Sequence, residues 1–401
     1  INPMAFKNYS VRDTIPPVVL GLYYKLMPEN SISGSNSSFN ELKLKKISNN
    51  LFISDTLKTS GPVGFGINSF DRMNNTWNKM GLSNIKTNID GNEIFNMDLN
   101  SFSYDEWRHI NTFIDYPYYK NKKIKIQKLY IEEFNPLDMY KRSLGDGVVK
   151  INETNVTYLY SVKLFDFNKN QSEILVPIQW VKQNDLSNRK LDFENMFKVN
   201  KDSTYNFKFP GAKVSIEKNS FYTDKIIQIF EENNLLHVDK DSIPLLKGIT
   251  IKMDISRYND SIRNRTYIGR IGENKKSSFV SSKKEENYVI AKVNNLGDFV
   301  IKIDSIKPNI SVIDISDNQW ISNRKNLSIK ISDNESGVKN YRGTINDKWI
   351  LLEYNPMKGI LSYDFNDNVN RDDAKNVLEI KIEDNVGNEK KLIKTFYRKI
   401  K

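Results

Sequence analysis

The sequence predicts an all-β protein, and two observations support this expectation. Only 4 of its 401 residues are Ala, the residue that most favours a helix, so a mostly helical protein is excluded. Short stretches in which apolar and polar residues alternate recur between turn residues, as in residues 205–209 and 249–253, and this alternation is typical of strands. At about 100–200 residues per domain, the length predicts several β modules in series.

An internal repeat marks where two of the modules begin. The pattern Asp-x-Ile-x-Pro starts at Asp13 and again at Asp304, and each copy places a rigid X-Pro step before an apolar stretch. Downstream of each copy, an alternating strand ends in a turn that begins with an Asp, at Asp71 and at Asp333. We interpret both copies as entries into related modules.

The same order of landmarks continues to the end of each copy. A two-residue hairpin turn is expected at Asp90-Gly91 and at Asn346-Asp347. Each copy then closes with a strand and an Asp-x-x-x-Asn turn, whose Asp side chain is expected to accept backbone N–H bonds. We therefore predict a structural role in turns for Asp71, Asp166, Asn170, Asp333, Asp384 and Asn388.

These landmarks define the expected domains. Short alternating strands with a turn every 8–12 residues or so are typical of an immunoglobulin-like β-sandwich. We predict a linker from an upstream domain at 1–12, an Ig-like sandwich at 13–182, a distinct β module at 183–303 and a second Ig-like sandwich at 304–401.

The first copy is longer because of an insertion at about 100–147. A capping box at 103–106 predicts a helix, and a second helix is expected to start at Asn135-Pro136. One face of the first helix should pack on the sandwich through Trp107, Ile110, Phe113 and Ile114. In the distinct module, the polar segment 277–287 is expected to be an exposed, mobile loop.

Nothing in the residue inventory predicts a catalytic or metal site. The chain contains no Cys and only two His, His109 and His237, whereas catalytic zinc is usually held by closely spaced His. A triad with His237 and Asp239 would lack a Gly-x-Ser-x-Gly elbow. We expect no cofactor in this chain, although carboxylate pairs for glycoside hydrolysis, which meet only in space, stay open.

One Asn-rich segment has the alternating oxygen-bearing side chains of a calcium-binding loop. Its alternating oxygen side chains are Asp364, Asn366, Asn368 and Asn370. Val369 stands where such a loop requires Gly, and Lys375 stands where it requires Glu. A turn between strands is therefore favoured.

The basic charge does not predict a nucleic-acid partner. The net charge is +11, but it is spread over all the expected modules. Lys supplies 47 of the 60 basic residues, whereas recognition of phosphate and bases favours Arg. We expect a solvated, Lys-rich surface. No apolar run approaches the roughly 18–20 residues of a transmembrane segment.

Two stretches resemble a known family. Residues 61–75 (GPVGFGINSFDRMNN) and 105–116 (DEWRHINTFIDY) are similar to the region C-terminal to the catalytic domain in lysostaphin-type (LytM) zinc murein endopeptidases of Gram-negative bacteria. The opening residues 1–3 resemble the link that follows that catalytic domain. The resemblance implies a zinc-dependent cut in peptidoglycan, in the cell envelope.

The family's zinc motifs, His-x-x-x-Asp and His-x-His, have no counterpart here, so no catalytic residue is carried over and zinc is expected only in an upstream catalytic domain. We predict an accessory region that positions or regulates that domain in the periplasm or at the cell surface, with the upstream domain and peptidoglycan or an envelope protein as partners. Its expected contact surface is Arg108, Asn111, Tyr116, Tyr118 and Tyr119. The alternatives are an adhesin-like stalk of Ig repeats and a complete enzyme with carboxylate chemistry.

Overall fold

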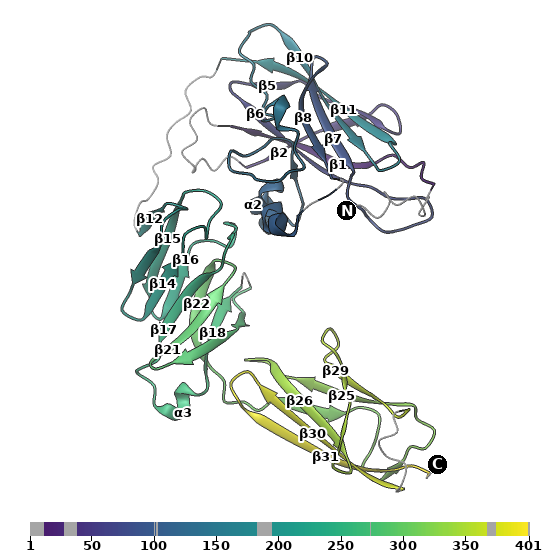
Figure 1. Ribbon diagram of the computed structural model, residues 1–401, viewed down its shortest axis with the longest axis vertical. Helices are drawn as coiled ribbons and strands as arrows, with labels where there is room; N and C mark the ends of the chain where they lie inside the picture. Colours follow the sequence, from purple (N-terminus) through teal and green to yellow (C-terminus); the bar gives the residue numbers. More distant parts are fainter. Residues whose placement is uncertain are drawn as a thin grey trace.

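The strands form six sheets that pair into three successive modules (Figure 1). The structure is a computed structural model that describes residues 12–27, 38–99, 101, 103–182, 195–272, 274–366 and 374–399. It confirms the expected all-β fold, with Ig-like sandwiches as the first and third modules and a helix-bearing insertion in the first. Among the described residues, no helix is both long and apolar enough to cross a membrane.

The first module packs a four-stranded sheet against a seven-stranded one. In spatial order, the smaller sheet contains β2 (Asn40–Leu42), β1 (Val18–Leu26), β6 (Val63–Phe70) and β9 (Gln127–Lys128). The larger sheet contains β3 (Leu44–Lys46), β4 (Leu51–Ser54), β11 (Gln171–Trp180), β10 (Thr157–Phe165), β7 (Asn84–Ile89) and β8 (Asn92–Asp98), with β5 (Leu57–Thr59) also paired to β11.

The core of this module follows from the two-residue period of its strands. Val63, Phe65 and Ile67 alternate along β6 and are fully buried between the sheets. The Phe65 ring stacks on Tyr160 of the opposite sheet with 4.1 Å between ring centres. Asp90 and Gly91 have φ angles of +45° and +84° in the β7–β8 hairpin, which is the backbone of the expected type I′ turn.

The insertion is less regular than the sequence predicts. It contains the 3₁₀ helices η2 (Tyr104–His109) and η3 (Arg142–Leu144) and the α-helices α1 (Ile110–Phe113) and α2 (Tyr116–Lys122). The predicted packing of Trp107 and Ile110 on the sandwich is wrong: they are 58% and 45% exposed, whereas Phe113 is buried. The four residues are divided between η2 (Trp107), α1 (Ile110 and Phe113) and the extended residue Ile114 that ends α1, so they do not form the face of one continuous helix.

The predicted helix at Asn135-Pro136 is also absent. The Asn135 side chain instead accepts a hydrogen bond of 3.0 Å from the backbone N–H of Leu137. Such a bond closes an Asx turn, which competes with helix formation at this position.

The second module is a sandwich of a six-stranded and a five-stranded sheet. The first contains β12 (Met196–Val199), β15 (Lys225–Glu232), β16 (Leu235–Val238), β22 (Gly297–Ile303), β18 (Thr266–Ile271) and β19 (Ser277–Val280). The second contains β13 (Tyr205–Lys208), β14 (Ala212–Ile216), β17 (Ile249–Asp254), β21 (Tyr288–Val293) and β20 (Ser282–Glu285); the short helix α3 (Asp260–Arg263) precedes β18.

The expectation of a mobile loop at 277–287 is wrong, because this segment forms β19 and β20. Each is the last strand of its sheet. An edge strand can carry polar and charged side chains on its open side, so the polar composition of this segment does not prevent strand pairing.

The third module repeats the strand pairing of the first. One sheet contains β23 (Asn309–Val312), β25 (Asn326–Ser332), β29 (Ile360–Asp364) and β28 (Glu353–Asn355). The other contains β24 (Gln319–Trp320), β31 (Glu389–Tyr397), β30 (Lys375–Asp384), β26 (Val338–Ile345) and β27 (Lys348–Ile350). The last strand pairs in parallel with an earlier short strand in both modules: β11 with β4 and β5, and β31 with β24.

The turns of the third module also match those of the first. Asn346 and Asp347 have φ angles of +48° and +63° between β26 and β27, so the second predicted hairpin turn is present. Of the Asn-rich segment considered for calcium, Asn368, Val369 and Asn370 lie outside the described residues.

Candidate functional site

The insertion of the first module contacts the second module, and this contact is called the joint here. The guanidinium of Arg108 donates to the carbonyl of Leu246 at 2.8 Å. The Tyr222 hydroxyl donates to the Arg108 carbonyl at 2.5 Å and accepts from the Asn111 amide at 3.4 Å. Figure 1 shows α2 at the edge of the first module nearest the second.

An ion-pair group strengthens the joint. Oδ2 of Asp241 in the second module lies 2.7 Å from Lys120 Nζ of α2 and 2.8 Å from the guanidinium of Arg270. Burial alone would lower the pKa of Lys120, but the hydrogen bond and charge of the Asp241 carboxylate raise it. The pair is partly buried, so solvent screens it less than a fully exposed pair.

One histidine of the joint, His109, is partly buried. The rings of His109 and Tyr222 meet edge to face, with 5.4 Å between their centres. Nδ1 of His109 is buried and has no hydrogen-bond partner within the described part of the chain. Burial lowers the pKa of His109, and the nearby Glu106 carboxylate opposes this shift. Burial therefore disfavours the protonated form of His109.

The predicted contact surface is not a single exposed platform. Arg108 and Asn111 are used inside the chain, at the joint, so their assignment to an external partner is wrong. Tyr118 packs edge to face on Tyr23 of β1 with 5.7 Å between ring centres. Tyr116 and Tyr119 are partly buried, and their rings lie under the amines of Lys120 and Lys125, respectively.

Two of the predicted turn residues of the first module, Asp71 and Asp166, form a second candidate site together with Asp13. Carboxylate oxygens of Asp13, Asp71 and Asp166 all lie within 4.8 Å of one another. Asp13 precedes β1, Asp71 follows β6, and Asp166 follows β10. The fold therefore brings together three acidic residues that are separated by 58 and 95 positions in the sequence (71 − 13 and 166 − 71).

The third module has an equivalent cluster. Carboxylate oxygens of Asp304, Asp333 and Asp384 also lie within 4.8 Å of one another. The closing Asn is placed in the same way in both modules: the side-chain amide of Asn170 donates to Asp166 at 2.6 Å, and that of Asn388 donates to Asp384 at 2.7 Å. The internal repeat therefore extends to individual hydrogen bonds.

The two clusters differ at the second Asp. Oδ1 of Asp333 accepts backbone N–H bonds from Glu335 at 3.1 Å and Gly337 at 2.7 Å. Oδ1 of Asp71 is buried without any hydrogen-bond partner among the described residues, although Asp71 is only 4% exposed. Burial raises the pKa of Asp71 to about 6; the N–H of Arg72 opposes this shift, and the charges of Asp166 and Asp13 add to it.

The structural role predicted for these residues therefore holds only in part. Asp166 and Asp384 accept the backbone N–H bonds of their own turns, at 2.7 Å from Asn170 and 2.8 Å from Asn388. Oδ1 of Asp71 accepts none. In the sequence each Asp belongs to a separate loop, so its neighbours do not indicate that the three carboxylates of a module lie close together. The matched order of landmarks in the two copies was the signal that could have indicated it.

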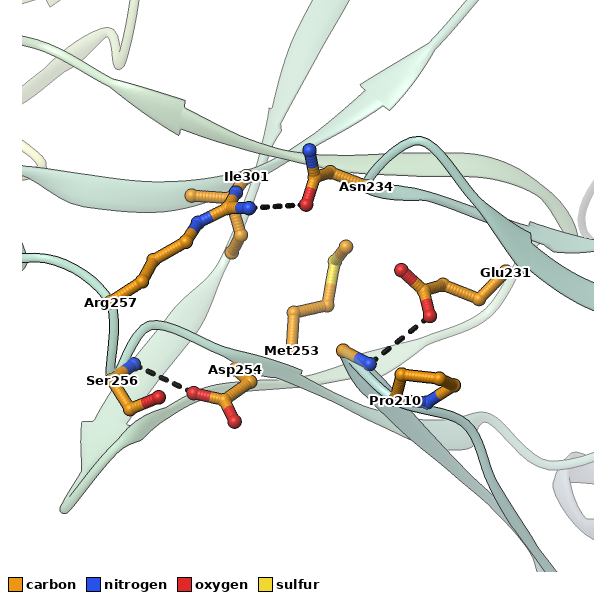
Figure 2. Close-up of a pocket in the computed structure, with 9 residues that line it drawn as sticks. Pro210, Glu231, Asn234, Met253, Asp254, Ser256, Arg257 and Ile301 are labelled. Carbon is orange, nitrogen blue, oxygen red and sulfur yellow. Dashed lines mark hydrogen bonds between the residues drawn. The ribbon is translucent and has the colours of Figure 1, made fainter.

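A small pocket lies at one end of the second module (Figure 2). Its volume of about 210 Å³ is below the roughly 300–1,000 Å³ of small-molecule sites. The charged side chains that line it already have partners: Glu231 accepts from Gly211 N–H, Asp254 accepts from Ser256 N–H, and Arg257 donates to Asn234. The pocket is thus a small, polar end of the sandwich whose charged side chains already make hydrogen bonds within the module.

One family model matches the sequence of the second module. Residues 194–304 match the family model described as Zu5-like domain. No curated protein matches the chain.

Three solved structures illustrate the structural likeness. Fibronectin(III)-like modules of Clostridium thermocellum CbhA align at 4% identity over 86% of this chain and 88% of that one, with a TM-score of 0.19. Sidekick-1 immunoglobulin domains 1–4 align at 8% identity over 96% and 94%, with a TM-score of 0.18. A 1.5-MDa bacterial ice-binding adhesin aligns at 7% identity over 86% and 93%, with a TM-score of 0.16. At these values the likeness carries no argument about function.

Proposed function

We propose that this chain is the accessory region of a cell-envelope peptidoglycan metallopeptidase and that it positions or regulates an upstream catalytic domain absent from this chain. The resemblance of residues 61–75 and 105–116 to the region that follows the catalytic domain in LytM endopeptidases supports this proposal. In the structure, the first stretch contains β6 and Asp71, and the second runs from η2 into α2.

The observation that carries the proposal is the joint. The insertion of the first module forms helical segments, and three residues on these segments bond to the second module: Arg108, Asn111 and Lys120. Contacts of this kind restrict the angle between neighbouring modules, whereas a flexible linker would leave them free to move. An arm with a fixed angle can hold a catalytic domain at a set distance and orientation from the wall.

The residues of this chain do not fit the zinc centre of that family. His109 lies in the joint, and His237 lies in the second module, where its Nδ1 is 2.6 Å from the Asp298 carboxylate. The zinc of the proposed enzyme would be held by the upstream domain. We therefore expect the isolated chain neither to bind one equivalent of zinc nor to cleave peptidoglycan.

The joint also favours a second candidate, an adhesin-like stalk of Ig repeats. If the insertion had presented Arg108 and Asn111 to an external partner, a simple spacer would have been a poor explanation for it. Both residues are instead used within the chain, and a stalk that must stay extended benefits from a stiff joint. In this case the partner would be a surface protein or glycan at the far end.

The test uses the complete gene product, the same product without residues 1–401, and residues 1–401 alone. Each is incubated with purified peptidoglycan sacculi, and both sedimentation with the sacculi and release of soluble fragments are measured. We expect zinc-dependent release by the complete product and reduced binding or release when residues 1–401 are removed. Residues 1–401 alone should release nothing.

Two results would contradict the accessory function. One is a complete gene product that releases no fragments with zinc present, which would favour the stalk. The other is release by residues 1–401 alone, which would point to carboxylate chemistry within this chain.

A further inference from the structure

The strongest unassigned feature is the cluster of Asp13, Asp71 and Asp166 at the entry of the first module. These residues are only 7%, 4% and 2% exposed. None of the ion pairs found among the described residues involves any of them. Three buried carboxyl groups without a cationic partner are costly, because a buried charge requires pairing or a metal.

The protein satisfies two of the three carboxylates with its own N–H groups. Oδ1 of Asp13 accepts from the backbone of Ile15 at 3.1 Å and of Asn74 at 3.2 Å. Asp166 accepts from the backbone and the side chain of Asn170. Oδ1 of Asp71 is the exception, since it is buried without a donor within the described ranges. This oxygen has lost water without gaining a protein partner.

We propose that Asp13, Asp71 and Asp166 bind one divalent cation, Ca²⁺, and that Oδ1 of Asp71 is one of its ligands. Oxygen ligands lie about 2.3–2.6 Å from Ca²⁺, so two ligands on opposite sides of the ion are roughly 4.6–5.2 Å apart. The carboxylate oxygens of the cluster lie within 4.8 Å of one another. One ion in their midst is therefore within reach of all three carboxylates.

The chemistry of the ligands favours Ca²⁺ over other ions. Carboxylate oxygens are hard ligands, which suit Ca²⁺ and Mg²⁺ better than metals that prefer His or Cys. Mg²⁺ requires ligands at about 2.0–2.1 Å in near-ideal octahedral geometry and keeps several waters. The carboxylates here are fixed by turn hydrogen bonds, so they cannot readily close around the smaller ion.

The third module supplies a matched internal control. Its cluster has the same three acidic positions, but two backbone N–H groups occupy Oδ1 of Asp333. Ser336 also donates to Asp304 through its backbone at 3.1 Å and its hydroxyl at 2.6 Å. In the third module, protein donors therefore replace the cation.

The test uses residues 1–401, stripped of metal with a chelator, and the variants Asp71→Asn and Asp333→Asn. CaCl₂ and MgCl₂ are titrated by calorimetry, and thermal unfolding is followed with and without CaCl₂. Asp71→Asn removes a buried charge but no protein hydrogen bond to Oδ1, so it should fold in the absence of metal. Without CaCl₂, an unfolding transition of the first module shows that Asp71→Asn is folded, and one of the third module shows the same for Asp333→Asn.

The wild-type chain should bind one equivalent of Ca²⁺ with a Kd of about 10⁻⁴–10⁻³ M, as expected of extracellular modules. At about ten times that Kd, its first module should melt roughly 3–6 °C higher. Asp71→Asn should lose both effects, and Asp333→Asn should keep both. The proposal is overturned if the wild type shows neither heat nor a shift at about 10 mM CaCl₂, or if Asp71→Asn binds as well as the wild type. No upstream domain is needed, so this outcome is independent of the proposed function.

Discussion

The side-chain amide of Asn170 donates a hydrogen bond of 3.1 Å to the backbone carbonyl of Asp13, which lies 157 residues earlier in the chain. In the third module, the amide of Asn388 donates to the carbonyl of Asp304 at 3.0 Å. In both modules the last Asp-x-x-x-Asn turn is thus hydrogen-bonded to the first residue of the module, Asp13 or Asp304. This bond ties the ends of the sandwich together.

Asn170→Ala should therefore destabilise the first module. The substitution removes the bonds from the Asn170 side chain to Asp13 and Asp166, and we expect a loss of about 1–3 kcal/mol in the free energy of unfolding. Chemical denaturation of the whole chain measures it. Asn388→Ala is the matched variant and should lower only the third module's transition. Equal transitions for Asn170→Ala and the wild type would show that the fastening bond is unimportant.

Gly66→Ala should disturb the packing of the insertion on β6. A Cβ at this position would lie 2.4 Å from Ile126 Cγ2 and 3.0 Å from the Phe39 ring. Ile126 and Phe39 are buried in a small cluster with Tyr23 and Tyr130, so they have little room to move. We expect a cost of about 1–3 kcal/mol from overpacking, measured as a lower thermal midpoint of the first module.

The control for this substitution is Gly81→Ala, because a Cβ at Gly81 would meet nothing within 4 Å. Its thermal midpoint should match that of the wild type. A Gly66→Ala chain as stable as Gly81→Ala would mean that the insertion is not packed on β6 as described.

The joint should weaken in acid. Docking buries His109 and lowers its pKa from the ordinary 6.5, so the undocked state binds the proton more tightly than the docked state. The stabilisation is fully present above about pH 6.5 and is lost as the pH falls through the lowered pKa. Glu106 opposes this effect, while burial raises the pKa of Tyr222, so Tyr222 does not change charge in this range.

Trypsin cleavage at the joint, compared at about pH 7.5 and pH 5.5 with rates corrected for the enzyme's own pH dependence, measures this effect. Cleavage should be faster in acid for the wild type. His109→Gln removes the titrating group, so its rate should be the same at both values. Identical behaviour of the wild type and His109→Gln would rule out His109 as the cause.

Much of the fold could be predicted from the sequence because successive side chains of a strand face the core and the solvent in turn, which gives hydrophobicity a two-residue period. The alternation in β6 and the Asp90-Gly91 turn fix which residues face the core and where the chain reverses. The repeated landmarks also predicted that the first and third modules are related. These features depend on residues close together in the sequence, so they can be predicted without knowing the tertiary contacts.

The failed predictions depended on contacts between distant residues. Nothing near Arg108 in the sequence indicates that Tyr222 and Leu246 would occupy it. The polar strands β19 and β20 were predicted as a loop because edge pairing does not require apolar residues. Asp71 and Asp166 matched ordinary turn residues and Asp13 matched a module entry, and only the folded sandwich brings the three together.

The joint is expected to make the first two modules move as one arm. The chain has no Cys, so Lys58→Cys and Lys218→Cys place one spin label on an exposed position of each module. The distribution of distances between the labels tests the claim most directly. We predict one narrow distribution in the wild-type background and a broader one after Tyr222→Phe and Asp241→Asn, which remove the hydrogen bonds of the Tyr222 hydroxyl to Arg108 and Asn111 and the charge that pairs with Lys120. A broad distribution in the wild-type background would contradict the claim.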